Sequence, residues 1–233
     1  MVYTRTVDGK ALNFASSGKL YRDALLMIDQ ETGSLWTQVD GTVLRGKLKG
    51  AKLTALAAVH TTWSEWKQLH PDTLVLKKDA RIQETLYSGY QADPNRLGIV
   101  GSHNPDARLP GKALVVALQE NGKSLAVPVA TLEREPLYQT KLGKRPVVVV
   151  YNPAGSTVRV FDRRVGKQAL TFGVVERGST VVLQDMETMT LWSGLTGKAL
   201  TGKLADQQLE AIPHLVSYWF AWAAYHPDTH LNR

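Results

Sequence analysis

Two histidines and two carboxylates between positions 60 and 72 could do metal or acid–base chemistry. His60, Glu65, His70 and Asp72 combine imidazole and carboxylate groups, which bind transition metals or transfer protons near neutral pH. On one helix, about 15 Å would separate the two histidines along the axis, so they share an ion only if the first one precedes the helix and folds back. His60 is therefore the metal-ligand candidate, and His60 and Glu65 are candidate catalytic groups.

The motif that contains the second histidine occurs twice. His70-Pro71-Asp72-Thr73 is repeated as His226-Pro227-Asp228-Thr229. Repeated residues usually maintain a repeat unit, so we expect the histidines and aspartates of both motifs to be structural and to support helix ends. His60, in contrast, is replaced by Val216 in the other copy. A difference between copies is where a specialised function would appear.

All six tryptophans belong to the same repeat. Three of them recur 156 positions later: Trp36, Trp63 and Trp66 as Trp192, Trp219 and Trp222. Aligned without gaps, Asp29–Thr73 and Asp185–Thr229 share 18 identities in 45 positions. This self-similarity predicts two copies of one structural unit. We interpret the tryptophans as core residues, with Trp36 also a candidate platform for a ligand.

Upstream of the tryptophans the repeat continues at an offset of 158, which aligns Arg5 with Arg163. Either arginine could hold an anionic ligand, and Arg5 also joins the candidate catalytic groups. The alternative is a buried ion pair with Asp29 or Asp185, which recur together with the arginines. The change of offset indicates a two-residue insertion, which we expect in a hairpin turn near Ser16-Ser17-Gly18.

The repeat divides the chain into a first unit at 1–77, a central segment at 78–145 and a second unit at 146–233. The second unit opens with an apolar strand, 146–151, whose counterpart in the first unit would lie before Met1. We therefore expect the first unit to lack its opening strand and the chain to be truncated. The central segment is expected to be the leading part of the second unit.

Short runs rich in Val, Leu, Thr and Phe alternate with Gly turns, which indicates antiparallel strands. The expected strands are 157–165, 168–174, 180–186 and 189–192, with 113–119 and 124–129 in the central segment. The expected helices are 60–70, which begins with a Thr62/Glu65 capping box, and 216–226. We predict an α+β fold, mainly antiparallel β, with two homologous repeat units, each closed by one short Trp-rich helix whose Trp face packs on a sheet.

Composition excludes several classes of protein. The 233 residues include no cysteine, which excludes disulfides, thiolate catalysis and cysteine-bound zinc. No apolar run is long enough for a transmembrane segment. The net charge is +7, but the densest basic cluster, 45–52, has no interleaved aromatic residues, so no nucleic-acid partner is expected. The N-terminus as written has no signal peptide, which would leave the chain in the cytoplasm.

Several runs make the sequence resemble domain-of-unknown-function family 3179. They are Glu31–Trp36, His60–Trp66, Arg108–Pro110, Val160–Arg163 and Tyr218–Trp222, with the two His-Pro-Asp-Thr motifs. The family has no established activity, and the resemblance implies a secreted, periplasmic or lipid-anchored protein with a longer N-terminus. Many members carry Cys-Pro-Leu-Cys after a Val-rich strand, where this chain has Asn152-Pro153-Ala154-Gly155. No thiol role can be carried over to this chain.

Two hypotheses for function follow. The first is a non-catalytic binding or structural module, associated with the envelope in its full-length form, because no catalytic constellation is complete. The alternative is a metal-binding protein or enzyme with a site between the units around His60, Glu65 and Arg5. A polar cleft lined by non-repeated residues would favour the alternative, and a filled interface the first. The ligand and any cofactor are unknown, and a homodimer through an exposed strand edge is expected.

Overall fold

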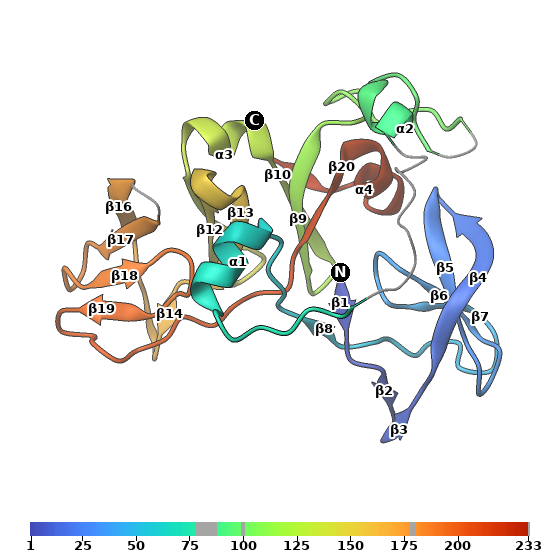
Figure 1. Ribbon diagram of the computed structural model, residues 1–233, viewed down its shortest axis with the longest axis horizontal. Coiled ribbons are helices and arrows are strands. Elements are labelled where there is room, and N and C mark those ends of the chain that lie inside the picture. Colours follow the sequence, from blue (N-terminus) through green and yellow to red (C-terminus); the bar gives the residue numbers. More distant parts are fainter. Residues whose placement is uncertain (78–87, 99–100, 178–179, 233) are drawn as a thin grey trace.

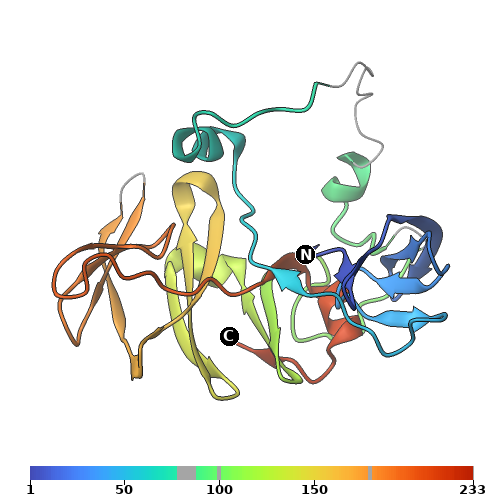
Figure 2. The same cartoon turned by 90° about the horizontal axis from the view of Figure 1, so that it is seen from below.

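The protein is built mainly of antiparallel β-sheets with a few short helices, as the sequence predicts (Figure 1). The structure is a computed structural model that describes residues 1–77, 88–98, 101–177 and 180–232. In two views at right angles, the sheet of residues 14–45 lies at one end and the sheet of residues 172–201 at the other, with the central strands between them (Figures 1 and 2). The expected strands 113–119, 124–129, 180–186 and 189–192 are present with ends that differ by a few residues, whereas 157–165 and 168–174 are each divided into two strands of different sheets.

The sheet of the first unit is a four-stranded antiparallel meander. Its strands are β4 (Phe14–Tyr21), β5 (Ala24–Asp29), β6 (Leu35–Thr37) and β7 (Val43–Arg45). Two short pairs precede and flank it: β2 (Thr6–Val7) with β3 (Lys10–Ala11), and β1 (Val2–Tyr3) with β8 (Ala55–Leu56).

The second unit contains the same series of pairings. Its four-stranded meander is β16 (Phe172–Arg177), β17 (Val181–Asp185), β18 (Leu191–Ser193) and β19 (Ala199–Thr201), preceded by the pair β14 (Arg164–Val165) and β15 (Gln168–Ala169). The Tyr3–Ala55 pairing of β1 with β8 has its counterpart in a bridge between Phe161 and Ala211. Pairings therefore recur at the positions that the sequence repeat aligns.

The two-residue insertion lies near Ser16-Ser17-Gly18, as expected, but it forms a bulge and not a hairpin turn. No turn forms at Ser16-Ser17-Gly18, because β4 continues through these residues. Ser16 pairs with Met27 and Leu20 with Leu25, so four steps along β4 oppose two along β5. This bulge absorbs the extra residues within the strand. The turn follows at Arg22 and Asp23, which both have positive φ.

Two central sheets connect the units. The first has the order β20–β9–β10–β21, from Leu215–Tyr218, Leu114–Glu120, Lys123–Pro128 and His230–Leu231. The second is β11 (Leu137–Leu142), β12 (Arg145–Asn152) and β13 (Thr157–Asp162). The short helices α2 (Ser88–Ala92), α3 (Val129–Arg134) and η1 (Pro153–Gly155) lie in the connections.

The apolar strand β12 is buried on both faces, which explains its continuous run of valines. Val147 and Val149 pack in one core with residues of β9 and β10. Val148 and Val150 point to the opposite side and pack in a second core with residues of β17 and β18. The β11–β13 sheet is therefore the middle layer between two others.

The two Trp-rich helices are shorter than expected. They span Trp63–Leu69 (α1) and Trp219–Tyr225 (α4). The prediction of a helix from residue 216 was wrong, because Leu215–Tyr218 form β20 and pair with β9. His60 also lies outside its helix, in a bridge with Val158. Pairing with a neighbouring strand prevails over the apolar pattern that favours a helix.

Each helix packs on the other half of the molecule. Helix α1 lies against η1 of the second unit. In α4, the Tyr225 hydroxyl donates to the Tyr21 carbonyl at 2.9 Å, and Arg22 Nη1 donates to the Ala224 carbonyl at 2.7 Å. The helices therefore cross between the two halves and join them.

Candidate functional site

Glu65 lies at one of these crossings. Its backbone N–H donates to Thr62 Oγ1 at 3.4 Å, which is one half of the expected capping box. Its carboxylate does not reach back to Thr62. It accepts hydrogen bonds from the Thr61 and Thr157 hydroxyls and from Asn152 Nδ2. The side chain is 8% exposed, so Glu65 joins α1 to the second unit through a buried carboxylate.

The space around this carboxylate is filled. A Cβ atom placed on Gly155 would overlap the Glu65 carboxylate and the Thr157 hydroxyl. Gly155 occupies the last position of the Asn-Pro-Ala-Gly stretch, where only a residue without a side chain leaves room for the carboxylate. Nothing in this packing leaves space for a substrate beside Glu65.

His60 is exposed and lies apart from the other candidates. With His214 it lines a cavity of about 260 Å³. His214 is buried, its ring Nδ1 lies 3.0 Å from the Ile212 carbonyl, and burial lowers its pKa. Among the described residues, no group of three or more His, Asp or Glu side chains is placed to hold a metal ion. His60 as a metal ligand stays a prediction.

The repeated histidines pack against tryptophans at the helix ends. The rings of His70 and His226 lie 4.2 and 3.9 Å, between centroids, from Trp66 and Trp222. The backbone N–H of His70 donates to the Trp66 carbonyl, and the backbone N–H of His226 donates to the Trp222 carbonyl. His226 Nε2 additionally lies 3.0 Å from Asp40 Oδ1.

The threonine and the aspartate of each helix-end motif have the same environment in both copies. The indole N–H groups of Trp66 and Trp222 donate to Thr73 and Thr229 at 3.0 and 3.1 Å. The two aspartates, Asp72 and Asp228, are exposed. Threonine, and not aspartate, therefore closes the helix end in each copy.

Trp63 and Trp219 occupy equivalent positions but different environments. Trp219 is 0% exposed, whereas Trp63 is 53% exposed. The expected packing of the first helix's Trp face on a sheet is therefore incomplete at Trp63. The described part of the first unit has no counterpart of the β9–β10 hairpin, which provides the core around Trp219.

The strand tryptophans are held by buried carboxylates. Trp36 Nε1 donates to Asp29 Oδ2 at 2.8 Å, and Trp192 Nε1 to Asp185 Oδ2 at 2.9 Å. Both indoles are fully buried, which leaves Trp36 no surface for a ligand platform. Burial by itself would raise the pKa of Asp29, but hydrogen bonds from Trp36 and Thr32 outweigh it and lower that pKa.

The two repeated arginines do not pair with these aspartates. Arg5 Nη1 donates to Asn13 Oδ1 at 2.8 Å, and Arg163 Nη1 donates to the Leu170 carbonyl at 2.5 Å. Within the described residues, Arg5 makes no hydrogen bond or ion pair with His60 or Glu65. The structure therefore does not bring the three candidate catalytic residues together.

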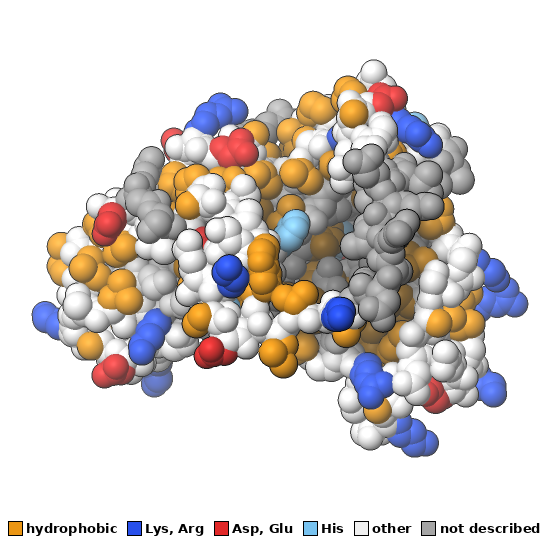
Figure 3. Space-filling model, in the orientation of Figure 1, with side chains coloured by type: hydrophobic (Ala, Val, Ile, Leu, Met, Phe, Trp, Pro, Cys, Tyr) orange, Lys and Arg blue, Asp and Glu red, His pale blue; other side chains and the backbone are white. Residues whose placement is uncertain are grey.

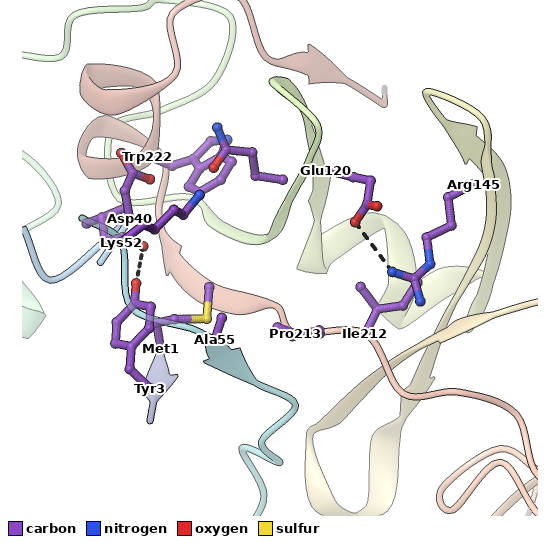
Figure 4. A pocket seen from close by; sticks show the side chains of 12 residues that line it. Met1, Tyr3, Asp40, Lys52, Ala55, Glu120, Arg145, Ile212, Pro213 and Trp222 are labelled. Atoms are coloured by element: carbon purple, nitrogen blue, oxygen red, sulfur yellow. Dashed lines mark hydrogen bonds and ion pairs between the residues drawn. The ribbon is translucent and has the colours of Figure 1, made fainter. Parts of the chain in front are cut away.

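A cavity of about 230 Å³ lies between the first unit and the central strands, and we call it the central cavity. Figure 4 shows Tyr3, Asp40 and Lys52 on one side of it and Glu120 and Arg145 on the other. Apolar lining comes from Met1, Val39, Ala55, Ile212, Pro213 and Trp222. The cavity thus has two charged walls that face each other across an apolar surface.

The wall formed by Glu120 and Arg145 is fixed by ion pairs. Arg145 lies 2.9 Å from Asp162, 2.6 Å from Glu210 and 3.4 Å from Glu120. Burial alone would lower the pKa of Arg145, but the bonds to Glu210 and Asp162 outweigh this effect and raise it. Arg145 therefore remains charged and holds Glu120 at the edge of the cavity.

The opposite wall combines a neutral phenol with one anion and one cation. The Tyr3 hydroxyl donates to the Val39 carbonyl at 2.7 Å, and burial together with Asp40 raises the pKa of Tyr3 far above its ordinary value. Asp40 is held by His226. Lys52 is exposed, and its ammonium group has no partner among the described side chains.

Sequence reasoning missed this cavity, although the repeat contains a signal for it. The three polar lining residues of the first unit all differ from their counterparts in the second unit: Tyr3, Asp40 and Lys52 correspond to Phe161, Thr196 and Gln208. Phe161 is fully buried, and its ring lies over Gly197 as the Tyr3 ring lies over Gly41. Of the two repeat units, only the first therefore contributes polar side chains to the lining.

The surface and the helices add two further observations. On the face seen in Figure 3, Lys and Arg side chains are scattered among apolar and acidic ones, and a histidine lies in a central hollow. Of the helices in the described part of the chain, none has the length and apolar character to cross a membrane.

Comparison with known proteins gives a family and no more. No curated protein and no solved structure matches the chain. The family described as "Protein of unknown function (DUF3179)" matches residues 1–229. The chain therefore belongs to the DUF3179 family.

Proposed function

We propose that this protein is a non-catalytic binding module that holds a small zwitterionic ligand in the central cavity. The observation that carries the proposal is the distribution of charge, with one cation and one anion on each wall. Asp40 and Lys52 stand on one side, and Glu120 and Arg145 on the other. A ligand with an ammonium and a carboxylate group, such as a small amino acid, complements both walls.

Lys52 and Glu120 are the groups expected to contact such a ligand. Arg145 is held by ion pairs with Asp162 and Glu210, and Asp40 by a contact with His226. Lys52 has no partner among the described side chains, and Glu120 makes one longer ion pair, 3.4 Å from Arg145. The ligand carboxylate would face Lys52, and its ammonium group would face Glu120. A cavity of about 230 Å³ restricts the ligand to a small molecule.

Two features favour binding over catalysis. The carboxylate of Glu65 is occupied by three donors in a filled contact. The lining of the central cavity contains no serine, threonine, cysteine or histidine that could act as a nucleophile with an adjacent base. The polar groups of the lining therefore position a ligand, and none of them is a serine, threonine, cysteine or histidine nucleophile.

We further infer that the two halves are homologous units, of which only the first has specialised. The matched Asp–Trp, Trp–Thr and Trp–His contacts at equivalent positions support this inference. In this view the ligand site is marked by the residues that differ, which are Tyr3, Asp40 and Lys52. Replacing each of them with its counterpart in the second unit should leave the fold intact.

The test is calorimetric titration with alanine, using acetate and methylamine as probes that carry one charge each. We expect alanine to bind more tightly than either, and Lys52→Gln, which introduces the residue of the second unit, to weaken binding at least about fivefold. Lys49→Gln, in the same loop but outside the cavity lining, is the matched control. Equal affinity for alanine and acetate, or equal effects of the two substitutions, would overturn the proposal.

Metal content distinguishes this proposal from the alternative centred on His60. Mass spectrometry of untagged protein should find no stoichiometric metal. A stoichiometric ion that is lost in His60→Ala would contradict the proposal and favour a metal-binding protein or enzyme.

A further inference from the structure

Arg159 is a half-buried cation that the central cavity does not use. It lies on β13, paired with Val150 of β12, and its guanidinium carbon is 5.2 Å from the centre of the Phe161 ring. The residue is partly exposed, but its Nε atom is completely buried and has no hydrogen-bond acceptor in the described structure. Solvent can therefore reach only part of the guanidinium.

No carboxylate of the described residues compensates this charge. The half-buried Arg145 and Arg108 each lie within 3.0 Å of an aspartate, whereas no described carboxylate lies within 4.0 Å of Arg159. Burial lowers the pKa of Arg159, and no acidic group offsets that effect. A cation withdrawn from water without a counter-ion destabilises a fold, so such groups usually have a partner.

The surroundings of Arg159 are basic. His214 is buried close enough for the Arg159 charge to act on it, and the lowering of the His214 pKa comes first from burial and also from that charge. His60 lies on the segment that pairs with Val158, the neighbour of Arg159. Both histidines line the cavity of about 260 Å³. The lining of that cavity contains no carboxylate, and Arg159 lies beside this region without being one of the lining residues.

We propose that the guanidinium group of Arg159 binds an oxyanion. The planar guanidinium suits the paired oxygens of phosphate, sulfate or a carboxylate, and the bound anion supplies a counter-charge that the described residues do not provide. The site is separate from the central cavity, whose lining does not include Arg159, so the two proposals are independent.

The experiment is thermal unfolding in chloride, phosphate, sulfate and acetate at equal ionic strength. The wild type should gain several degrees in Tm in at least one oxyanion. Arg159→Leu should lose this gain, and in chloride it should melt no lower than the wild type, because it removes an uncompensated buried charge. Phosphate and sulfate also stabilise proteins in general, so the gain counts only as the difference between wild type and variant.

Arg163→Leu is the matched control. Its Nε is also buried without an acceptor, but Arg163 Nη1 donates to the Leu170 carbonyl. This variant should melt lower in chloride and keep the oxyanion gain. A gain in acetate alone identifies a carboxylate ligand, and a gain in phosphate or sulfate identifies a tetrahedral one. Absence of any gain in the wild type, or an equal gain in Arg159→Leu, would overturn the proposal.

Discussion

At the scale of single residues, buried carboxylates organise both meanders. Asp29 and Asp185 each accept hydrogen bonds from a tryptophan and a threonine that follow within seven positions. The sequence could predict that the tryptophans Trp36 and Trp192 are buried, because they recur and are apolar. It could not predict their partners, since recurrence alone also favoured arginines that in the structure bond elsewhere.

The indole–carboxylate bonds should contribute measurably to stability. Trp36→Phe and Trp192→Phe each keep an aromatic ring, although a smaller one, and remove one donor to a buried carboxylate, so we expect each to lose at least about 1–3 kcal/mol of unfolding free energy. Urea denaturation of the single variants checks this. A loss below about 0.5 kcal/mol in both would show that the bonds add nothing beyond ring packing.

Asp162 should make the fold sensitive to acid. Burial alone would raise its pKa, but hydrogen bonds from Arg164 and Arg145 outweigh it and lower the pKa below the ordinary 3.8. A carboxylate with a lowered folded pKa stabilises the fold fully above the unfolded value, and this stability is lost as pH falls through the folded pKa. Unfolding free energy should therefore decrease below about pH 4, and less steeply in Asp162→Asn. Identical slopes for the two proteins would contradict the role of Asp162.

At the scale of elements, the helices join the two halves of the molecule. The sequence predicted where both helices end, because a proline follows each one, and it predicted the Thr62 cap of α1. It could not predict that α1 docks on η1, since the partners of Glu65 lie about 90 positions away. The strand β20 was missed for the same reason, because its pairing with β9 is equally distant in sequence.

Docking of α1 on η1 should depend on glycine, which has no side chain, at position 155. Gly155→Ala introduces a Cβ where the Glu65 carboxylate lies, so we expect a loss of about 1–3 kcal/mol and faster proteolysis around α1. Gly89→Ala is the control, because no atom lies within 4 Å of its Cβ position and alanine favours a helix. Equal stability of the two variants would mean that α1 is not held against η1.

At the scale of the whole molecule, the presence of antiparallel strands was predictable, but their assembly into stacked sheets was not. Periodicity indicated antiparallel strands, and the valine run of β12 indicated an apolar strand. The stacking of three sheets depends on contacts between distant segments, which periodicity does not contain. The central cavity lies at such a junction, so only the differences between the two copies could have indicated its residues.

The segment after α1 differs from its counterpart and should promote association. In the second unit, His230–Leu231 pairs with β10, whereas Leu74 and Leu76 are 96% and 81% exposed. Exposed apolar residues without a strand partner favour self-association. We expect a concentration-dependent dimer by light scattering, weakened by Leu74→Glu but not by Leu44→Glu. A monomer at every concentration, or equal effects of both substitutions, would contradict this.

The ligand site in the central cavity is tested most directly by nuclear magnetic resonance of the tryptophan indole N–H groups during titration with alanine. Trp222 lines the central cavity, whereas Trp36 and Trp192 are fully buried in other cores. We predict a saturable shift of the Trp222 signal, with the Trp36 and Trp192 signals unchanged, and loss of the shift in Lys52→Gln. A Trp222 signal that does not move at saturating alanine would contradict a ligand site in the central cavity.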